Sequence, residues 1–139
     1  MNWTKFSVAT LIGGVAYFLL GWVVFGIILR DLTALPDDVA AVVQIPEEEF
    51  KISFMIISCL ILGAFYSLIL MKWANVSTFT GGLKVTALIG GLYTLVVGFS
   101  MASMFRMNSV DQIFINAIGD AVCSGLTGGI IGWYLGRGQ

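Results

Sequence analysis

The sequence contains no histidine and only two cysteines. Without imidazole, a bis-histidine haem, a histidine-ligated zinc or iron centre and a histidine-dependent nucleophilic triad are all excluded. Cys59 and Cys123 form no C-x-x-C motif, and two thiols alone do not complete a metal site. We therefore predict a protein that is not an enzyme and that carries no cofactor and no metal.

Charge is also scarce. Charged residues make up 11% and hydrophobic residues 58% of the 139 residues, compared with roughly 25% and 45–50% in soluble domains. The basic residues are few and scattered, so nucleic-acid binding, which needs a basic patch, is not expected. This composition is typical of an integral membrane protein, so we predict that its helices contact the lipid bilayer.

Four long apolar runs account for this composition, at residues 8–29, 52–71, 85–105 and 113–135. Each run matches the roughly 20 residues that a helix needs to cross a hydrocarbon core of about 30 Å. None alternates in polarity as the strand of a membrane barrel would. Because the linkers are short, consecutive helices should be antiparallel neighbours. We predict an all-α membrane protein, with residues 1–139 forming one domain that is a compact antiparallel bundle of four transmembrane helices.

The linker 30–51 is the longest, and it holds six of the eight acidic residues. Pro46 followed by Glu47, Glu48 and Glu49 predicts the N-terminus of the second helix, because carboxylates favour the positive end of the helix dipole. A short surface helix is expected over 38–44. Ser109 with Gln112 three residues later predicts a capping box.

Basic residues near the helix ends indicate the orientation. An N-terminus in the cytoplasm places four basic residues inside and three outside: Lys5, Lys72, Lys84 and Arg137 against Arg30, Lys51 and Arg106. In this orientation Trp3, Trp73 and Trp133 all lie at the cytoplasmic interface, which amphipathic rings favour. We predict that both termini are cytoplasmic and that the acidic loop is external.

Asp120 is the only charged residue inside the four runs. An aspartate at the centre of a membrane helix costs roughly 2.5–3.5 kcal/mol on insertion scales. Asn116, Ser124 and Thr127 share its face of the helix, and Ser58 lies at a similar depth on the second helix. Two interpretations follow. A neutral Asp120 donates a hydrogen bond to Asn116, Ser58 or a backbone carbonyl, or the carboxyl group binds a proton or cation in a polar cleft.

Glycine is frequent in the runs, and small residues allow membrane helices to approach closely. The predicted helix-packing glycines are Gly13, Gly14, Gly21, Gly90, Gly91, Gly98, Gly128, Gly132 and Gly136. The spacing of the first three is repeated by the next three, which indicates either a parallel two-helix duplication or a chance coincidence.

Three segments carry a resemblance: IGGVAYFLLGW at 12–22, VSTFTGGLK at 76–84 and GGIIGW at 128–133. They resemble small bacterial four-helix integral membrane proteins of an uncharacterised domain-of-unknown-function family. The resemblance implies this architecture and a bacterial cytoplasmic (inner) membrane location. It brings no catalytic or binding residues with it.

Two functions stay open at this point. The short linkers and glycine-lined faces favour a noncatalytic packing or accessory component of a membrane assembly. The alternative is a minimal proton- or cation-linked channel or carrier that uses Asp120 in an oligomeric bundle. Either function predicts a homo-oligomer or a complex with other membrane protein subunits.

Overall fold

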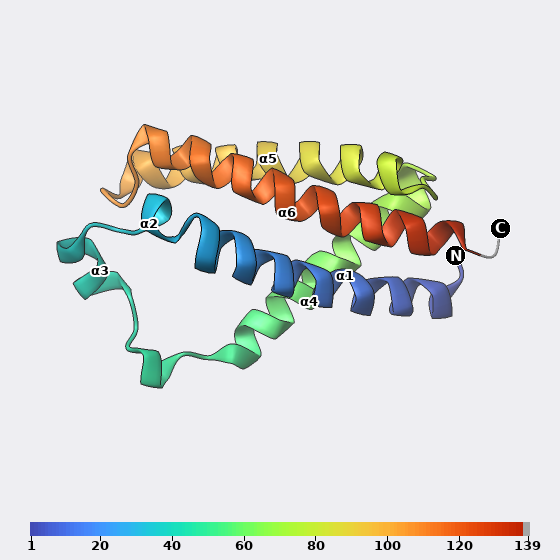
Figure 1. The fold of residues 1–139 in the computed structure, drawn as a ribbon, viewed down its shortest axis with the longest axis horizontal. Helices are drawn as coiled ribbons and strands as arrows, with labels where there is room; N and C mark the ends of the chain where they lie inside the picture. Colours follow the sequence, from blue (N-terminus) through green and yellow to red (C-terminus); the bar gives the residue numbers. More distant parts are fainter. Residues whose placement is uncertain (138–139) are drawn as a thin grey trace.

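A computed structural model describes residues 1–137, and that part of the chain contains helices but no strand. Two of the long helices end in a π-helical segment. In chain order the elements are α1 (Trp3–Val23), η1 (Val24–Ile28), α2 (Arg30–Thr33), α3 (Asp37–Val43), η2 (Glu47–Glu49), α4 (Ile52–Leu68), η3 (Ile69–Trp73), α5 (Phe79–Met104) and α6 (Val110–Gly136) (Figure 1).

Four helices are long and apolar enough to cross a membrane: Trp3–Ile28, Ile52–Trp73, Phe79–Met104 and Val110–Gly136. Their number is the predicted one, but the first and third begin five or six residues before the apolar runs. The reason is capping. The Asn2 side chain accepts a hydrogen bond from Lys5 N at 3.1 Å, and the Thr78 hydroxyl accepts one from Gly81 N at 3.1 Å. The helices therefore extend through polar residues to their caps.

The local predictions had mixed outcomes. The capping box is confirmed, since Gln112 N donates to Ser109 Oγ at 3.3 Å and Ser109 N donates to Gln112 Oε1 at 3.1 Å. The short surface helix is confirmed as α3. The prediction that Pro46 and the three glutamates begin the second membrane helix is wrong. They form the separate turn η2, because the extended backbone of Phe50 breaks the helix before α4 begins at Ile52.

The helices are arranged around α6. Helix α5 lies along α6, and α1 packs against both α4 and α6, whereas α4 crosses α1 obliquely (Figure 1). Both termini lie at one end of the molecule, here called the termini end, and α2 and α3 lie at the other, the loop end (Figure 1). Residues 50–58, which include the start of α4, are all exposed.

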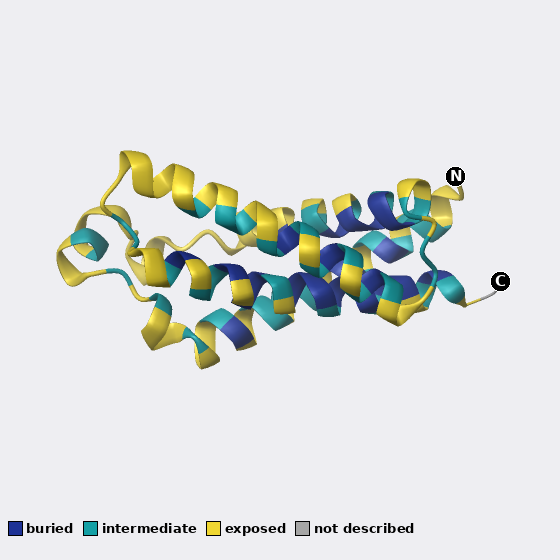
Figure 2. Cartoon of the chain, turned by 90° about the horizontal axis from the view of Figure 1, so that it is seen from above, coloured by how far each residue is buried: buried dark blue, intermediate teal, exposed yellow. Residues whose placement is uncertain are grey.

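The hydrophobic core lies toward the termini end. Its buried members are Ala9, Tyr66, Leu70, Ile131 and Leu135, which join α1, α4, η3 and α6. Exposed residues dominate the loop end (Figure 2). The two ends of the molecule therefore differ in how tightly the helices pack.

Glycines permit the close contacts on which this packing depends. A methyl group at Gly13 would lie 2.6 Å from Ile131 Cδ1, and one at Gly63 would lie 2.6 Å from the backbone nitrogen of Gly14. A methyl group at Gly82 would lie 2.7 Å from the carbonyl carbon of Gly128. The first two positions hold α1 close to α6 and α4, and the third holds α5 close to α6.

Most of the predicted packing glycines lie at such contacts. A methyl group would approach a neighbouring element to within 3.4 Å at Gly13, Gly14, Gly90, Gly91, Gly98, Gly128, Gly132 and Gly136. Gly21 is the exception, since a methyl group there meets no heavy atom within 4 Å. The packing role predicted for Gly21 is therefore not found within the chain, because α4 has diverged from α1 at this level.

Candidate functional site

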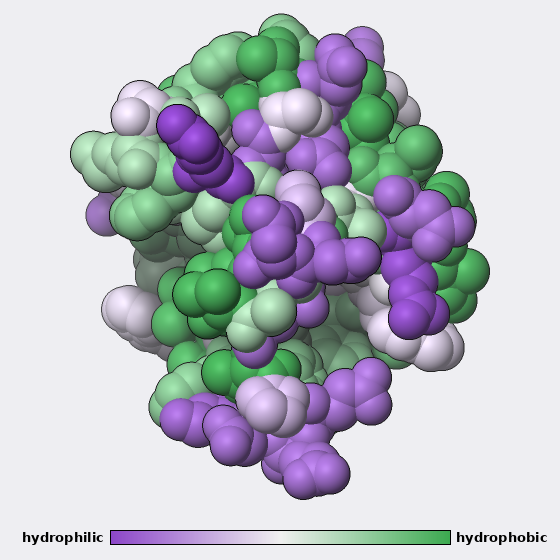
Figure 3. All heavy atoms as spheres, turned by 90° about the vertical axis from the view of Figure 1, so that its left-hand side faces the viewer, coloured by the Kyte–Doolittle hydropathy of each residue, from purple (hydrophilic) through white to green (hydrophobic). Residues whose placement is uncertain are grey.

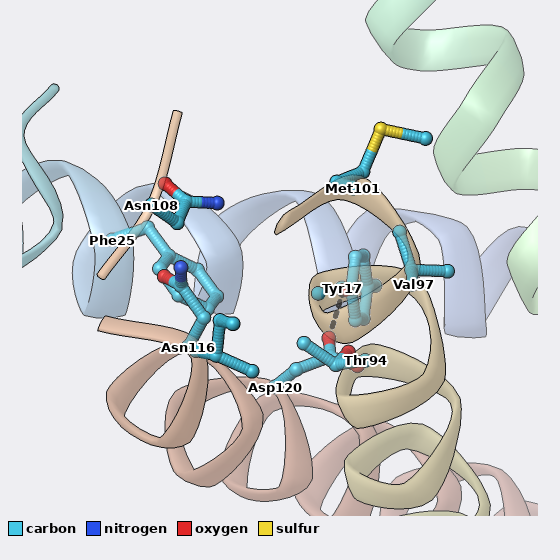
Figure 4. A pocket seen from close by; sticks show the side chains of 10 residues that line it. Tyr17, Phe25, Thr94, Val97, Met101, Asn108, Asn116 and Asp120 are labelled. Atoms are coloured by element: carbon cyan, nitrogen blue, oxygen red, sulfur yellow. Dashed lines mark hydrogen bonds between the residues drawn. The ribbon is translucent and has the colours of Figure 1, made fainter. Parts of the chain in front are cut away.

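Asp120 lies on α6, is 9% exposed, and is held by helices on both sides (Figure 4). The Tyr17 hydroxyl of α1 donates a hydrogen bond to Asp120 Oδ1. The Thr94 hydroxyl of α5 donates to Asp120 Oδ2 at 2.7 Å. The carboxyl group thus connects the three helices α1, α5 and α6.

These partners differ from the predicted ones. In one of the two interpretations of the sequence, a neutral Asp120 donates to Asn116, Ser58 or a backbone carbonyl, but its two oxygens accept from Tyr17 and Thr94. Carboxyl oxygens readily accept hydrogen bonds from hydroxyl groups. Tyr17 could have been recognised from the sequence, because a tyrosine hydroxyl inside an apolar span needs a hydrogen-bond partner.

A cavity of about 290 Å³ lies beside the carboxyl group. Its polar lining comes from Tyr17, Thr94, Asn108, Asn116 and Asp120, and lysine and arginine are absent from the lining. Asn108 belongs to the connection between α5 and α6 at the loop end, so the cavity extends from Asp120 toward that end (Figures 1 and 4). Since a water molecule occupies roughly 30 Å³ in the liquid, the cavity has room for several.

The cavity is closed toward the termini end. Ser124 and Thr127, the next residues on the same face of α6, are both fully buried, as is Ile131 one turn further on. By contrast, hydrophilic side chains gather across the loop end (Figure 3). The carboxyl group therefore faces one end of the molecule and is sealed from the other.

The remaining predicted site residues have different environments. Asn116 is half-buried and lines the cavity with Asp120. Ser124 belongs to a second polar cluster, in which its hydroxyl accepts from Tyr66 OH at 2.7 Å and its carbonyl accepts from Thr86 Oγ1 at 2.6 Å. The buried Thr127 hydroxyl has no hydrogen-bond partner among the described residues.

Ser58 lies apart from all of these. It is exposed on α4 and lines a different hollow with Lys51, Phe54 and Met55. Counting residues along the helices predicted that Ser58 and Asp120 lie at a similar depth in the membrane. Depth, however, does not tell in which direction a side chain points from its helix. The predicted contact between Ser58 and Asp120 is therefore wrong.

A second, larger cavity lies between α1 and the beginning of α4. It measures about 660 Å³ and its lining is mainly apolar, with Phe18, Trp22 and Met55 among the contributors. We call it the apolar groove. Tyr17 and Phe25 line both the apolar groove and the cavity beside Asp120. Gly21, which has no packing partner, lines the groove between these two aromatic residues.

Together, these features define an all-helical protein with four helices able to span a membrane and a buried carboxyl group among them. No family model, no curated protein and no solved structure matches the chain. The resemblance to small bacterial four-helix membrane proteins stays a prediction. No cluster of three metal-ligating side chains occurs within residues 1–137.

Proposed function

We propose that this protein is a minimal proton- or cation-linked channel or carrier in which Asp120 is the binding group. We place its four helices in the bacterial inner membrane as an antiparallel bundle from which the beginning of α4 diverges, with both termini in the cytoplasm and the acidic loop 30–51 outside. One observation carries the proposal. The cavity that ends at the buried carboxyl group extends toward one end of the molecule and is closed at the other.

The chemistry of the cavity supports cation binding. An ionised carboxylate offers about four acceptor positions, of which the Tyr17 and Thr94 hydroxyls take two. The others are free for a cation. Asn108 and Asn116 also line the cavity and offer neutral side-chain oxygens, and oxygen ligands suit hard cations. A carboxyl group within membrane spans commonly marks an ion or proton pathway.

Transport also requires passage toward the termini end. Ile131 and Leu70 are fully buried there, so this seal must open after the cation has bound. Such an opening separates helices around the glycine contacts of α1 with α4 and α6. An oligomeric bundle supplies neighbouring helices that cover the surfaces this movement exposes. We propose no chemical catalysis and no cofactor.

The test is a cation and proton flux assay in proteoliposomes. Asp120→Asn keeps the size of the side chain but removes the charge, and we expect it to abolish flux. The matched control is Asp111→Asn, which neutralises an exposed aspartate in the first turn of the same helix and should leave flux unchanged. An inactive natural chain, or equal flux in Asp120→Asn, contradicts the proposal.

The second candidate is a noncatalytic packing or accessory component. It is favoured by the exposed beginning of α4 and by Gly21, where an added methyl group would meet no heavy atom within 4 Å. A helix of another subunit on this face would account for both observations. Purification in mild detergent with mass determination tests it. A defined complex with another membrane protein supports the accessory role, and a free homodimer contradicts it.

A further inference from the structure

We infer that the site takes an amphipathic amine, with its protonated amino group at Asp120 and its hydrocarbon chain in the apolar groove. The inference rests on the proposed function and names its substrate class. Its basis is that a polar cavity with an unpaired carboxylate and a large apolar groove share the walls formed by Tyr17 and Phe25.

On the groove side, a glycine lies between Tyr17 and Phe25. Tyr17, Gly21 and Phe25 are four residues apart, so they lie on the same side of the helix formed by α1 and η1. Gly21 contributes no side chain, and a methyl group there would meet no heavy atom within 4 Å. Packing within the chain gives no reason for a glycine at this position, whereas a ligand that lies in the groove against this side of the helix does.

The polar cavity suits an amino group better than a bare ion. A volume of about 290 Å³ is much larger than one ion needs, and a protonated amine can donate to the acceptor positions of Asp120 that the hydroxyls leave free. The faces of Tyr17 and Phe25 attract organic cations. No basic side chain lines the cavity, so the carboxylate lacks a countercharge until a cation arrives.

The groove suits the hydrocarbon part. At about 660 Å³ it falls within the range of roughly 300–1,000 Å³ of small-molecule sites. It lies between α1 and the splayed beginning of α4, where the helices are exposed to the surrounding lipid. A neutral acyl chain or a second helix in the groove would leave the carboxylate unpaired. Charge complementarity therefore selects a cationic amphiphile.

The experiment follows the fluorescence of Trp22, which lines the groove. The other three tryptophans are replaced by phenylalanine, and the full chain is placed in phosphatidylcholine nanodiscs. The probe is a long-chain primary alkylamine with a terminal bromine, which quenches indole on contact. The matched control probe is the corresponding bromo-alcohol. We expect saturable quenching by the amine and only weak, linear quenching by the alcohol.

Three variants locate the binding. Asp120→Asn should weaken the apparent affinity for the amine by about tenfold or more, the ratio that corresponds to roughly 1.4 kcal/mol. Asp111→Asn should leave the affinity unchanged. Gly21→Leu should abolish saturable quenching while the fold persists, because the space around Gly21 is empty. Gly21→Leu thus keeps the inference testable if Asp120→Asn fails to fold.

Two results would overturn the inference: equal quenching by amine and alcohol, or an unchanged affinity in Asp120→Asn. Displacement of the amine by phosphatidylethanolamine would support it, because that lipid is itself an amphipathic primary amine. Crosslinking of Gly21→Cys between two copies would assign the groove to a second chain. Saturable amine binding without flux removes the transport proposal alone. Flux of small cations without saturable amine binding removes the substrate class alone.

Discussion

The termini end and the loop end of this molecule differ in how their helices pack. At the termini end, buried Ala9, Leu70 and Ile131 fill the space between helices. At the loop end, residues 50–58 are exposed, and a cavity and a groove separate the helices. The difference indicates that packing at the termini end stabilises the fold, whereas the loop end has room for a binding site.

The positions of the glycines explain the difference. Helices α1 and α4 approach most closely where Gly13 and Gly14 meet Gly63. Because α4 crosses α1 obliquely, the two helices separate on either side of this point (Figure 1). A methyl group at Gly21, two turns further along α1, would therefore meet no heavy atom within 4 Å, and Gly21 lines the groove instead.

The largest expected loss of stability comes from placing a side chain at Gly63, where α1 and α4 are in contact. A side chain there would overlap backbone atoms of Thr10 and Gly14, which cannot move aside as a flexible side chain can. We expect Gly63→Leu to lower the free energy of unfolding by about 3 kcal/mol, at the upper end of the usual cost of overpacking. Unfolding in a detergent titration measures it. Gly21→Ala is the control and should change stability by less than about 0.5 kcal/mol. Equal losses would remove the contrast between the two ends.

Tyr66→Phe probes the polar cluster of the termini end. It removes the hydrogen bond of 2.7 Å from Tyr66 to Ser124 but keeps the ring that packs in the core. We expect a loss of about 1 kcal/mol, typical of a buried hydrogen bond, and unchanged cation flux. Stability is read from the same titration and flux from proteoliposomes. A loss of flux with intact stability would show that the site extends into the termini end.

Thr94→Val makes the corresponding change at the loop end. It removes the hydrogen bond of 2.7 Å to Asp120 Oδ2, and Thr94 is only half-buried beside an open cavity. We expect a stability loss of about 0.6 kcal/mol, the average for polar contacts in membrane proteins, together with altered flux. The pair Tyr66→Phe and Thr94→Val thus separates stability from function. If Thr94→Val were the more destabilising variant and left flux intact, the functional assignment of the loop end would fail.

Sequence reasoning predicted what depends on local chemistry. The four apolar helices follow from hydropathy, and the capping box follows from the spacing of Ser109 and Gln112. The glycine spacing also predicted packing positions, and all of them except Gly21 lie at close contacts. Gly63 was missed because it is an isolated glycine in its run, although a methyl group there would overlap backbone atoms of α1.

The partners of Asp120 could not be predicted in the same way. Tyr17 and Thr94 reach the carboxyl group because of how α1 and α5 are rotated about their axes, and hydropathy does not report rotation when both faces of a helix are apolar. The divergence of α4 could not be predicted either. Residues 50–58 are exposed but include apolar residues, which in the sequence look like core residues. Only the contacts between helices distinguish them.

The central claim is that the carboxyl site is reached from the loop end alone. Asn116 lines the cavity, so Asn116→Cys, in a chain whose own Cys59 and Cys123 are replaced by alanine, can be exposed to a membrane-impermeant thiol reagent from each side in turn. Ile131→Cys, in the closed half, is the control that stays unlabelled. The account predicts labelling of Asn116→Cys only from the side of the loop 30–51. Protection from both sides, or labelling from the side of the termini, would contradict it.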